Sequence, residues 1–294
     1  MDVDGVFSGG GIKGLVFVGA YEVLEKRKFR FVRVAGTSAG AVFASLVAAG
    51  FSSGEMKDIM EQINFRLLTG GEETFPKRFF RWLSLYWKMG LYRGDDLEEW
   101  IGEVLRRRGI ETFSDLPPGS LRVVASDVSN GKILVLPDDL PGMGIPFESF
   151  PVARAVRMSA SIPYFFRPVR IKSGKNRALV VDGGVLSNFP IWLFMERKSG
   201  RNLRPILGMK ISAGENGMGA HTINNAFQLF EALFATMKDA HDARYISRTI
   251  AKNVIFLPVE GIHVTEFSLS EEKKNALLKL GREQAEKFLK TWSY

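Results

Sequence analysis

The sequence contains no cysteine, which excludes disulfide bonds, thiolate metal sites and cysteine nucleophiles. It also contains no run of about 18 apolar residues, so no membrane-spanning helix is expected. Its start, Met1–Asp4, is acidic and lacks the basic and apolar regions of a secretion signal. These absences predict a cytoplasmic protein.

Acidic residues are outnumbered by basic ones, with 40 Lys and Arg against 32 Asp and Glu, which gives a formal net charge of +8. Such an excess favours polyanionic surfaces such as nucleic acid or anionic lipid, and ordinary solubility explains it equally well. The hydrophobic fraction of 46% is ample for a large buried core. With no linker or repeat visible, we expect a single domain over residues 1–294.

Strand and helix patterns alternate along the chain, which predicts an α/β fold with a largely parallel sheet covered on both faces. Strands are expected at Val3–Ser8, Phe31–Ala35, Leu121–Ala125, Lys132–Leu136, Ala178–Val181, Ile206–Ile211 and Val254–Pro258. Helices are expected at Ile12–Lys28, Ala39–Ala49, Asp95–Arg108, Val152–Met158, Ile223–Ile250 and Ser270–Trp292.

The glycine run Gly9–Gly14 lies between the first expected strand and helix. Glycines there allow a sharp turn and leave N–H groups exposed beside a helix N-terminus, where they stabilise negative charge. Gly9, Gly11 and Gly14 also fit the dinucleotide fingerprint G-x-G-x-x-G. That fingerprint needs an acidic residue about 20 positions later, and the chain has Arg33 near that place, which could instead meet a 2′-phosphate. A nucleotide-binding enzyme is therefore the alternative interpretation of this loop.

The segment Gly36-Thr37-Ser38-Ala39-Gly40 matches G-x-S-x-G, the nucleophile elbow. Gly36 and Gly40 permit the strained turn that presents the Ser38 hydroxyl at the start of a helix. By itself the pattern occurs by chance in many proteins, where the serine caps a helix and the small residues pack closely. The upstream glycine loop, which can form an oxyanion hole, favours the nucleophile.

A serine hydroxyl needs a neighbouring base, and histidine, the usual one, is scarce. Of His221, His241 and His263, the last follows the turn Gly261-Ile262 and is the candidate for an ordinary triad in the chain order Ser, Asp, His. Asp182 is the better candidate, because it ends an apolar strand and is followed by Gly183 and Gly184, which leave the cleft open. The alternative is a simple Asp-Gly turn at a strand end.

Taken together, the segments Gly9–Gly14, Gly36–Gly40 and Asp182–Gly184 resemble the three motifs of the patatin-like phospholipase family. Ser159–Pro168 and Val185–Pro190 are similar to that family as well. The resemblance covers about residues 6–194, so residues 195–294 are expected to complete the fold.

The resemblance implies a three-layer α/β/α fold and a Ser–Asp dyad, with Ser38 as nucleophile and Asp182 as proton acceptor. It also implies an oxyanion hole made by the backbone N–H groups of Gly10, Gly11 and Ala39. The implied activity is that of a serine acyl hydrolase, a phospholipase A or lipid esterase that works through an acyl-enzyme.

This chemistry requires neither a cofactor nor a metal. The adjacent acidic pairs Asp95-Asp96 and Asp138-Asp139 lack the spaced ligands of a calcium loop and predict a helix start and a solvated turn. Because an aspartate titrates near about 4, activity should persist to mildly acidic pH. A fall near about 6.5 that disappears on replacing His263 would transfer the role of base to that histidine.

The segment 75–88 is rich in aromatic and basic residues and has no acid. Trp82 prefers a membrane interface, and Lys77, Arg78 and Arg81 attract anionic lipid, so the segment predicts peripheral membrane contact or a lid. A helix packed on the core with its cations in water fits equally well. No module for nucleic acid accompanies it, and we expect no nucleic-acid partner. A non-catalytic lipid-binding protein is disfavoured because both dyad residues are present.

Overall fold

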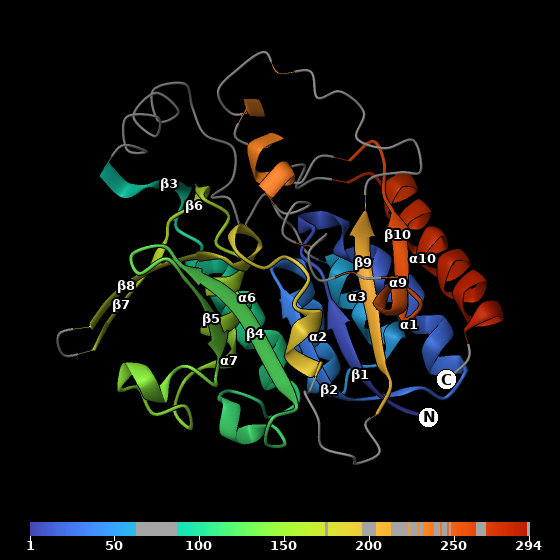
Figure 1. Cartoon of the computed structure of the whole chain (residues 1–294), viewed down its shortest axis with the longest axis horizontal. Helices are drawn as coiled ribbons and strands as arrows, with labels where there is room; N and C mark the ends of the chain where they lie inside the picture. The colour runs from blue at the N-terminus through green and yellow to red at the C-terminus, as the bar shows by residue number, and fades with distance from the viewer. Residues whose placement is uncertain are drawn as a thin grey trace.

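The computed structural model describes residues 1–62, 87–173, 176–195, 204–212, 248–262 and 269–292, together with residues 223, 228–229, 232–237, 242 and 246. Eight of the described strands form one sheet in the order β10-β9-β1-β2-β4-β8-β7, with β5 also paired to β4 (Figure 1). Their bounds are β1 Asp2–Phe7, β2 Arg30–Thr37, β4 Leu121–Asp127, β5 Lys132–Leu136, β7 Val169–Ser173, β8 Asn176–Asp182, β9 Ile206–Ser212 and β10 Val254–Pro258. A separate two-stranded sheet pairs β3, Gly90–Tyr92, with β6, Tyr164–Phe166.

The α-helices with described bounds are α1 Leu15–Lys26, α2 Ala39–Ala48, α3 Ser53–Gln62, α6 Asp95–Arg106, α7 Val152–Ser159, α9 Arg248–Ala251 and α10 Glu271–Thr291, and residues 232–237 are also helical. Short 3₁₀ helices are η1 Gly11–Gly14, η2 Phe113–Asp115, η3 Pro141–Met143, η4 Gly183–Val185 and η5 Ile191–Phe194. None of the helices in this part of the chain is long and apolar enough to cross a membrane.

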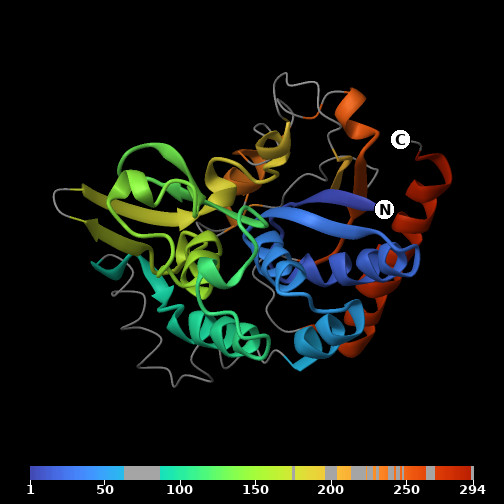
Figure 2. The same cartoon turned by 90° about the horizontal axis from the view of Figure 1, so that it is seen from below.

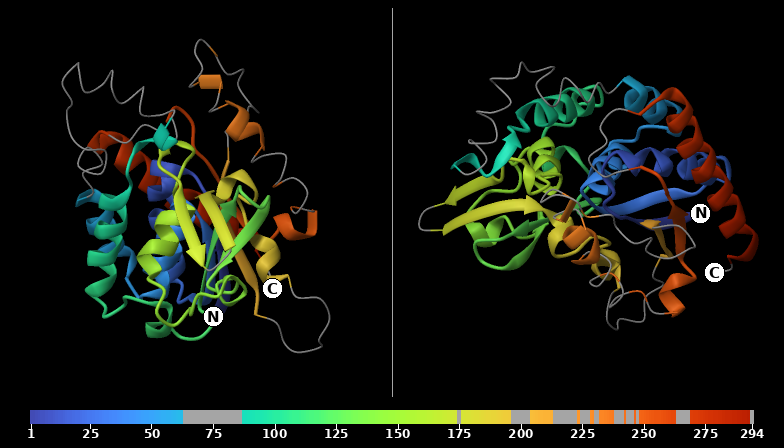
Figure 3. Two further views of the ribbon diagram at one scale, coloured as in Figure 1. Left: turned by 90° about the vertical axis from the view of Figure 1, so that its left-hand side faces the viewer. Right: turned by 90° about the horizontal axis from the view of Figure 1, so that it is seen from above.

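The sheet is covered on both faces. Along β1, Val3 and Phe7 face one hydrophobic core and Val6 faces a second, as the alternation of side chains along a strand requires. Helices from the first half of the chain lie on one face, and later segments, drawn yellow to orange, lie on the other (Figures 2 and 3). The fold is therefore the expected three-layer α/β/α arrangement.

Most predicted elements are present. The strands at Lys132–Leu136 and Val254–Pro258 have the predicted bounds, and the first helix differs in beginning as the 3₁₀ turn η1. The strands β3, β6 and β7 and the helix α3 were not predicted. β3 and β6 have three residues each, too few to show an alternating pattern. The predicted helix Ile223–Ile250 lies largely outside the described residues.

The central strand β4 determines which segments meet. It pairs with β5 along one edge, through Val123, Val124 and Ala125. Its other edge is shared: Val124 pairs with Thr37 of the parallel strand β2, and Ala125 pairs with Asp182 of the antiparallel strand β8. Strands β2 and β8 therefore end against neighbouring residues of the same edge, so that the residues after β2 and at the end of β8 face each other.

Candidate active site

Ser38 lies in the tight turn between β2 and α2. Its backbone angles are φ 54° and ψ −120°, outside the regions that L-residues favour. A Cβ at Gly36 would lie 2.1 Å from the carbonyl oxygen of Gly40, and a Cβ at Gly40 would lie 2.3 Å from that of Phe7. Both positions thus require glycine for close backbone approach. The turn has the geometry of a nucleophile elbow, and a conformation of this kind typically costs about 1–3 kcal/mol.

Ser159, at the end of α7, ties this turn to the sheet. The Ser38 N–H donates to Ser159 Oγ at 2.8 Å, and Ser159 Oγ donates to the carbonyl oxygen of Val124 at 2.5 Å. All three residues are buried. Because a buried N–H without an acceptor is costly, Ser159 helps to hold Ser38 in its strained conformation.

The glycine loop lies beside the elbow, where Gly14 approaches α2 so closely that a Cβ there would be 3.1 Å from the Ala39 Cβ. The N–H of Gly9 donates to the carbonyl oxygen of Asn188 at 3.0 Å, so this amide is already used. Gly11 has φ 59° and begins η1. Gly10, Gly11 and Ala39, the first residue of α2, remain as the candidate amide donors to an oxyanion.

Asp182 ends β8 and is 1% exposed. Its Oδ1 accepts a hydrogen bond from the Gly184 N–H at 2.7 Å, and its own N–H donates to the carbonyl oxygen of Ser161 at 2.8 Å. A Cβ at Gly183 would lie 2.2 Å from the Val124 carbonyl oxygen. The Asp-Gly-Gly sequence therefore combines a fixed carboxylate with a backbone that approaches the sheet closely.

Asn188 links the two halves of the candidate dyad. A Cβ at Gly9 would lie 2.6 Å from Asn188 Oδ1 and 3.3 Å from the Ser38 Cβ. A Cβ at Gly184 would lie 2.9 Å from Asp182 Oδ1 and 3.5 Å from the same Asn188 Oδ1. One buried oxygen, Asn188 Oδ1, therefore lies near both Ser38 and Asp182.

A buried ion pair between Asp242 and Lys210 holds the Asn188 side chain in place. Asp242 Oδ2 accepts from Asn188 Nδ2 at 3.1 Å and from Lys210 Nζ at 2.7 Å. Asp242 Oδ1 accepts from the Phe189 N–H at 3.0 Å. Lys210, on β9, is 8% exposed and Asp242 is 2% exposed. A lysine so deeply buried is rare unless it is paired.

The candidate residues predicted from sequence are mostly described. The structure brings together Ser38, Asp182, Gly9, Gly10, Gly11, Gly14, Gly36, Ala39, Gly40, Gly183 and Gly184. Arg33, the residue that could have met a 2′-phosphate, instead pairs with Asp4 at 2.5 Å. His221, His241, His263, Lys77, Arg78, Arg81 and Trp82 lie outside the described residues.

Four further residues of this site were not predicted from the sequence: Ser159, Asn188, Lys210 and Asp242. Ser159 and Asn188 lie in stretches that resemble the family, which was the one available signal. Lys210 and Asp242 lie in a region with no recognisable motif, and nothing in their sequence neighbourhood indicated that they meet.

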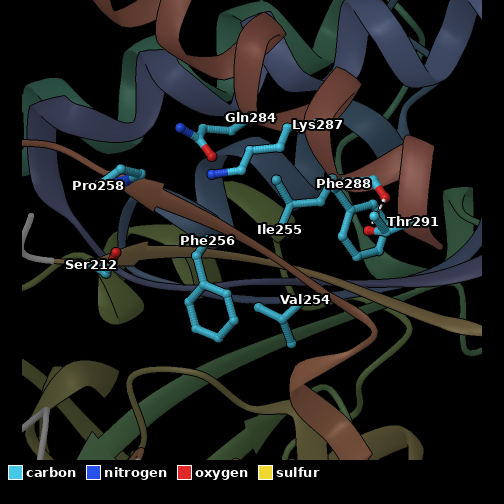
Figure 4. A pocket seen from close by; sticks show the side chains of 9 residues that line it. All are labelled: Ser212, Val254, Ile255, Phe256, Pro258, Gln284, Lys287, Phe288 and Thr291. Atoms are coloured by element: carbon cyan, nitrogen blue, oxygen red, sulfur yellow. Dashed lines mark hydrogen bonds between the residues drawn. The ribbon is translucent and has the colours of Figure 1, made fainter. Parts of the chain in front are cut away.

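Two other surface features are separate from this site. A groove of about 440 Å³ between β10 and α10 is lined by nine residues, among them Ser212, Phe256 and Lys287 (Figure 4). A second cavity of about 470 Å³ includes Arg122 and Phe147. Within the described residues, no three His, Asp or Glu side chains are grouped to hold a metal. Asp138 pairs instead with Arg122, and Asp95 begins α6.

A family model described as patatin-like phospholipase matches residues 5–195 of the chain. The chain is 52% identical over 295 residues, the full length of both proteins, to the uncharacterized protein YqhO of Bacillus subtilis. It is 22% identical to a probable lipid hydrolase, 463L, of invertebrate iridescent virus 6, over 67% of this chain and 64% of that protein. Among solved structures, VipD from Legionella pneumophila matches with a TM-score of 0.58 and 19% identity, covering 99% of this chain and 67% of that one.

Proposed function

The chain belongs to the patatin-like phospholipase family, and we propose that it is a lipid hydrolase that cleaves carboxylic esters with Ser38 as nucleophile and Asp182 as base. One observation carries the proposal: β2 and β8 end against neighbouring residues on the same edge of β4. This arrangement supports a common site for the Ser38 hydroxyl and the Asp182 carboxylate.

In the first half of the reaction, Ser38 Oγ attacks the ester carbonyl carbon while its proton passes to Asp182. The tetrahedral intermediate then collapses, the alcohol leaves with the proton from Asp182, and the acyl group remains on Ser38. In the second half, water attacks the acyl carbon and releases the fatty acid, which restores Ser38. Because the turn already holds Ser38 in place, little ordering remains to be done at the moment of attack.

The oxyanion is assigned to the N–H groups of Gly10, Gly11 and Ala39. The Gly9 amide is bonded to Asn188 and so takes no part. Ala39 is the first residue of α2, whose N-terminus carries partial positive charge. Each such donor typically contributes about 3 kcal/mol to lowering the barrier.

The dyad is tested by Ser38→Ala and Asp182→Asn, assayed with a p-nitrophenyl ester and labelled with a fluorophosphonate. We expect both variants to lose hydrolysis, and Ser38→Ala to lose labelling, with unchanged circular dichroism. Retained turnover in Asp182→Asn would remove the carboxylate from the mechanism. A pH–rate profile of the unaltered enzyme should lack an inflection near about 6.5, the range of histidine. Titration with NADPH tests the nucleotide alternative, for which saturable binding at the glycine loop would be required.

Contact with a membrane surface is the second part of the proposal. The basic aromatic segment 75–88, with Lys77, Arg78, Arg81 and Trp82, suits an anionic lipid surface, and Trp87 in the same segment is 75% exposed. Tyr164 and Leu233 are 53% and 54% exposed. They belong to β6 and to the orange helix at residues 232–237, both on the side to which the arrowheads of β1 and β9 point (Figure 1).

Binding to vesicles with and without anionic lipid tests this surface. We expect the triple replacement of Lys77, Arg78 and Arg81 by Ser to weaken binding, and added salt to weaken it further. Leu233→Ser should reduce hydrolysis of vesicle lipid while leaving hydrolysis of a soluble ester intact. Phe256→Ser, at an exposed apolar position on β10, is the matched control. Equal loss in both variants, or salt-independent binding, would contradict the assignment.

A further inference from the structure

Asn188 has a buried oxygen that its surroundings leave available. The residue is 2% exposed. Its Nδ2 donates to Asp242 Oδ2, and because a carboxylate only accepts, this contact fixes which side of the amide is the oxygen. Within the described part of the chain, Asn188 Oδ1 accepts no hydrogen bond. A buried acceptor of this kind normally has a donor, which a bound water molecule or a ligand can supply.

The oxygen faces the reacting groups. The positions that side chains at Gly9 and Gly184 would occupy lie 2.6 and 3.5 Å from Asn188 Oδ1. The first of these positions is also beside Ser38, and the second is also beside Asp182 Oδ1. Two oxygens that accept hydrogen bonds, Asn188 Oδ1 and Asp182 Oδ1, therefore face the same narrow space. Water, which carries two donors in a small volume, is the molecule that suits such a pair.

We propose that Asn188 Oδ1 binds the water that hydrolyses the acyl-enzyme, and that Asp242 and Lys210 are positioning residues for Asn188. The inference rests on the proposed function, because it assigns the second half of that reaction. One O–H of the water points to Asn188 and the other to Asp182. A lone pair of the water is then directed at the acyl carbon.

The step balances without any further reactant. Asp182 takes one proton from the water as the new C–O bond forms. The bond from the acyl carbon to Ser38 Oγ then breaks, and the proton passes from Asp182 to Ser38 Oγ. The second proton stays on the product acid, and Asn188 contributes a hydrogen bond but exchanges no proton. Asn188 thus selects the direction of attack, and the carboxylate supplies the basicity.

The ion pair behind Asn188 explains how the amide is held. Lys210 Nζ and the Phe189 N–H donate to Asp242, so the carboxylate stays in place to receive Asn188 Nδ2. Without Asp242, the carboxamide could rotate and present its nitrogen to the water, which would place a donor opposite a donor. Lys210 and Asp242 lie beyond residues 5–195, the part that the family model matches.

Partition of the acyl-enzyme between water and hydroxylamine tests the assignment. With a p-nitrophenyl ester and fixed hydroxylamine, the ratio of hydroxamic acid to free acid reports the attack of water whichever step limits turnover. For Asn188→Ala we expect this ratio to rise at least about tenfold, because hydroxylamine attacks esters without a second acceptor. Asn188→Ser keeps a donor for Asp242 but lacks the carbonyl, and should show the same rise if the alanine variant folds poorly.

Asn130→Ala is the matched control, since Asn130 also donates through Nδ2 to an aspartate, Asp127, at 2.6 Å, in the turn between β4 and β5. Its product ratio should equal that of the unaltered enzyme. An unchanged ratio in both Asn188 variants would overturn the inference. Absence of any hydroxamic acid from the unaltered enzyme would instead count against the acyl-enzyme, and hence against the proposed function itself. Asp242→Ala should raise the ratio less than Asn188→Ala, because the amide can still sample the productive orientation.

Discussion

The two sides of the candidate site are built in different ways. On one side, backbone geometry places the reacting groups: Gly9, Gly36, Gly40 and Gly184 each lie where a Cβ would come within 3 Å of another atom. On the other side, side chains hold the site in position, because Lys210 and Asp242 form a buried ion pair whose carboxylate accepts a hydrogen bond from Asn188.

One site can therefore combine two kinds of rigidity. Close backbone packing tolerates no added atom but needs no charge, so it leaves glycine motifs in the sequence. In a buried ion pair, replacing one partner by an uncharged side chain of similar shape is costly. The other charge is then left without its partner in a medium of low dielectric. Substitutions on either side should therefore differ in what they impair.

Replacement of the glycines should have the largest effect. Gly9→Ala places a methyl group 2.6 Å from Asn188 Oδ1, and Gly184→Ala places one 2.9 Å from Asp182 Oδ1. Displacement of the reacting groups by even 1 Å can reduce the rate about a hundredfold, and we expect kcat/KM for a soluble ester to fall at least that far. Gly54→Ala, with no atom within 4 Å of the added methyl group, should leave kcat/KM unchanged. Near-normal activity in Gly9→Ala would show that the backbone side is not tightly packed.

Breaking the ion pair should affect stability most. Lys210→Met leaves the Asp242 carboxylate buried without its cation, and we expect the free energy of unfolding to fall by about 3–5 kcal/mol. The double variant Lys210→Met with Asp242→Leu should recover part of this loss. Urea denaturation measures both, and Lys26→Met, which breaks an exposed pair with Glu22, should cost about 1 kcal/mol or less. A Lys210 loss as small as that of Lys26 would mean that the ion pair is not a rigid support.

The hydrogen bond from the Ser38 N–H to Ser159 joins the elbow to the sheet, and its removal should have an intermediate effect. Ser159→Ala leaves that N–H without its acceptor, at a cost of about 1–3 kcal/mol in stability. The strained turn should also relax, which lowers kcat more than it raises KM. The control is Ser149→Ala, because the Ser149 hydroxyl makes only an exposed hydrogen bond of 3.4 Å, to the carbonyl oxygen of Pro146. If kcat in Ser159→Ala matched the control, the turn would hold its shape without this contact.

The smallest effect is expected away from both sides of the candidate site, at the capping box that Thr112 and Asp115 form at η2. Backbone N–H groups of Thr112 and Glu111 donate to Asp115 and lower the pKa of its carboxyl group. A carboxyl group whose pKa is lower in the folded state stabilises the fold at pH values above its unfolded pKa, about 3.9. This contribution is lost as the pH falls through the pKa of the folded state. Asp115→Asn should therefore reduce Tm slightly at pH 7 and make progressively less difference below about pH 4. A Tm difference that persisted at low pH would point to a cause other than charge, and esterase activity at pH 7 should be unaffected.

The sequence determined the α/β order of elements and the three glycine motifs, because these depend on local properties. Periodicity identifies a strand such as β10, and a G-x-S-x-G turn must place its serine at a helix start wherever the strand lies in the sheet. The short strands β3 and β6 were not predicted, because three residues are too few to show a periodic pattern.

Tertiary structure alone decided that β2 and β8 meet on one edge of β4, and that Lys210 and Asp242 meet behind Asn188. Strand order and the pairing of distant side chains depend on how the whole chain packs, and no local pattern encodes a contact between residues 32 positions apart with no motif around them. The sequence therefore specified the parts of the candidate site that glycine builds. The part that buried charges hold became visible only in the folded molecule, because an ion pair has no characteristic spacing along the chain.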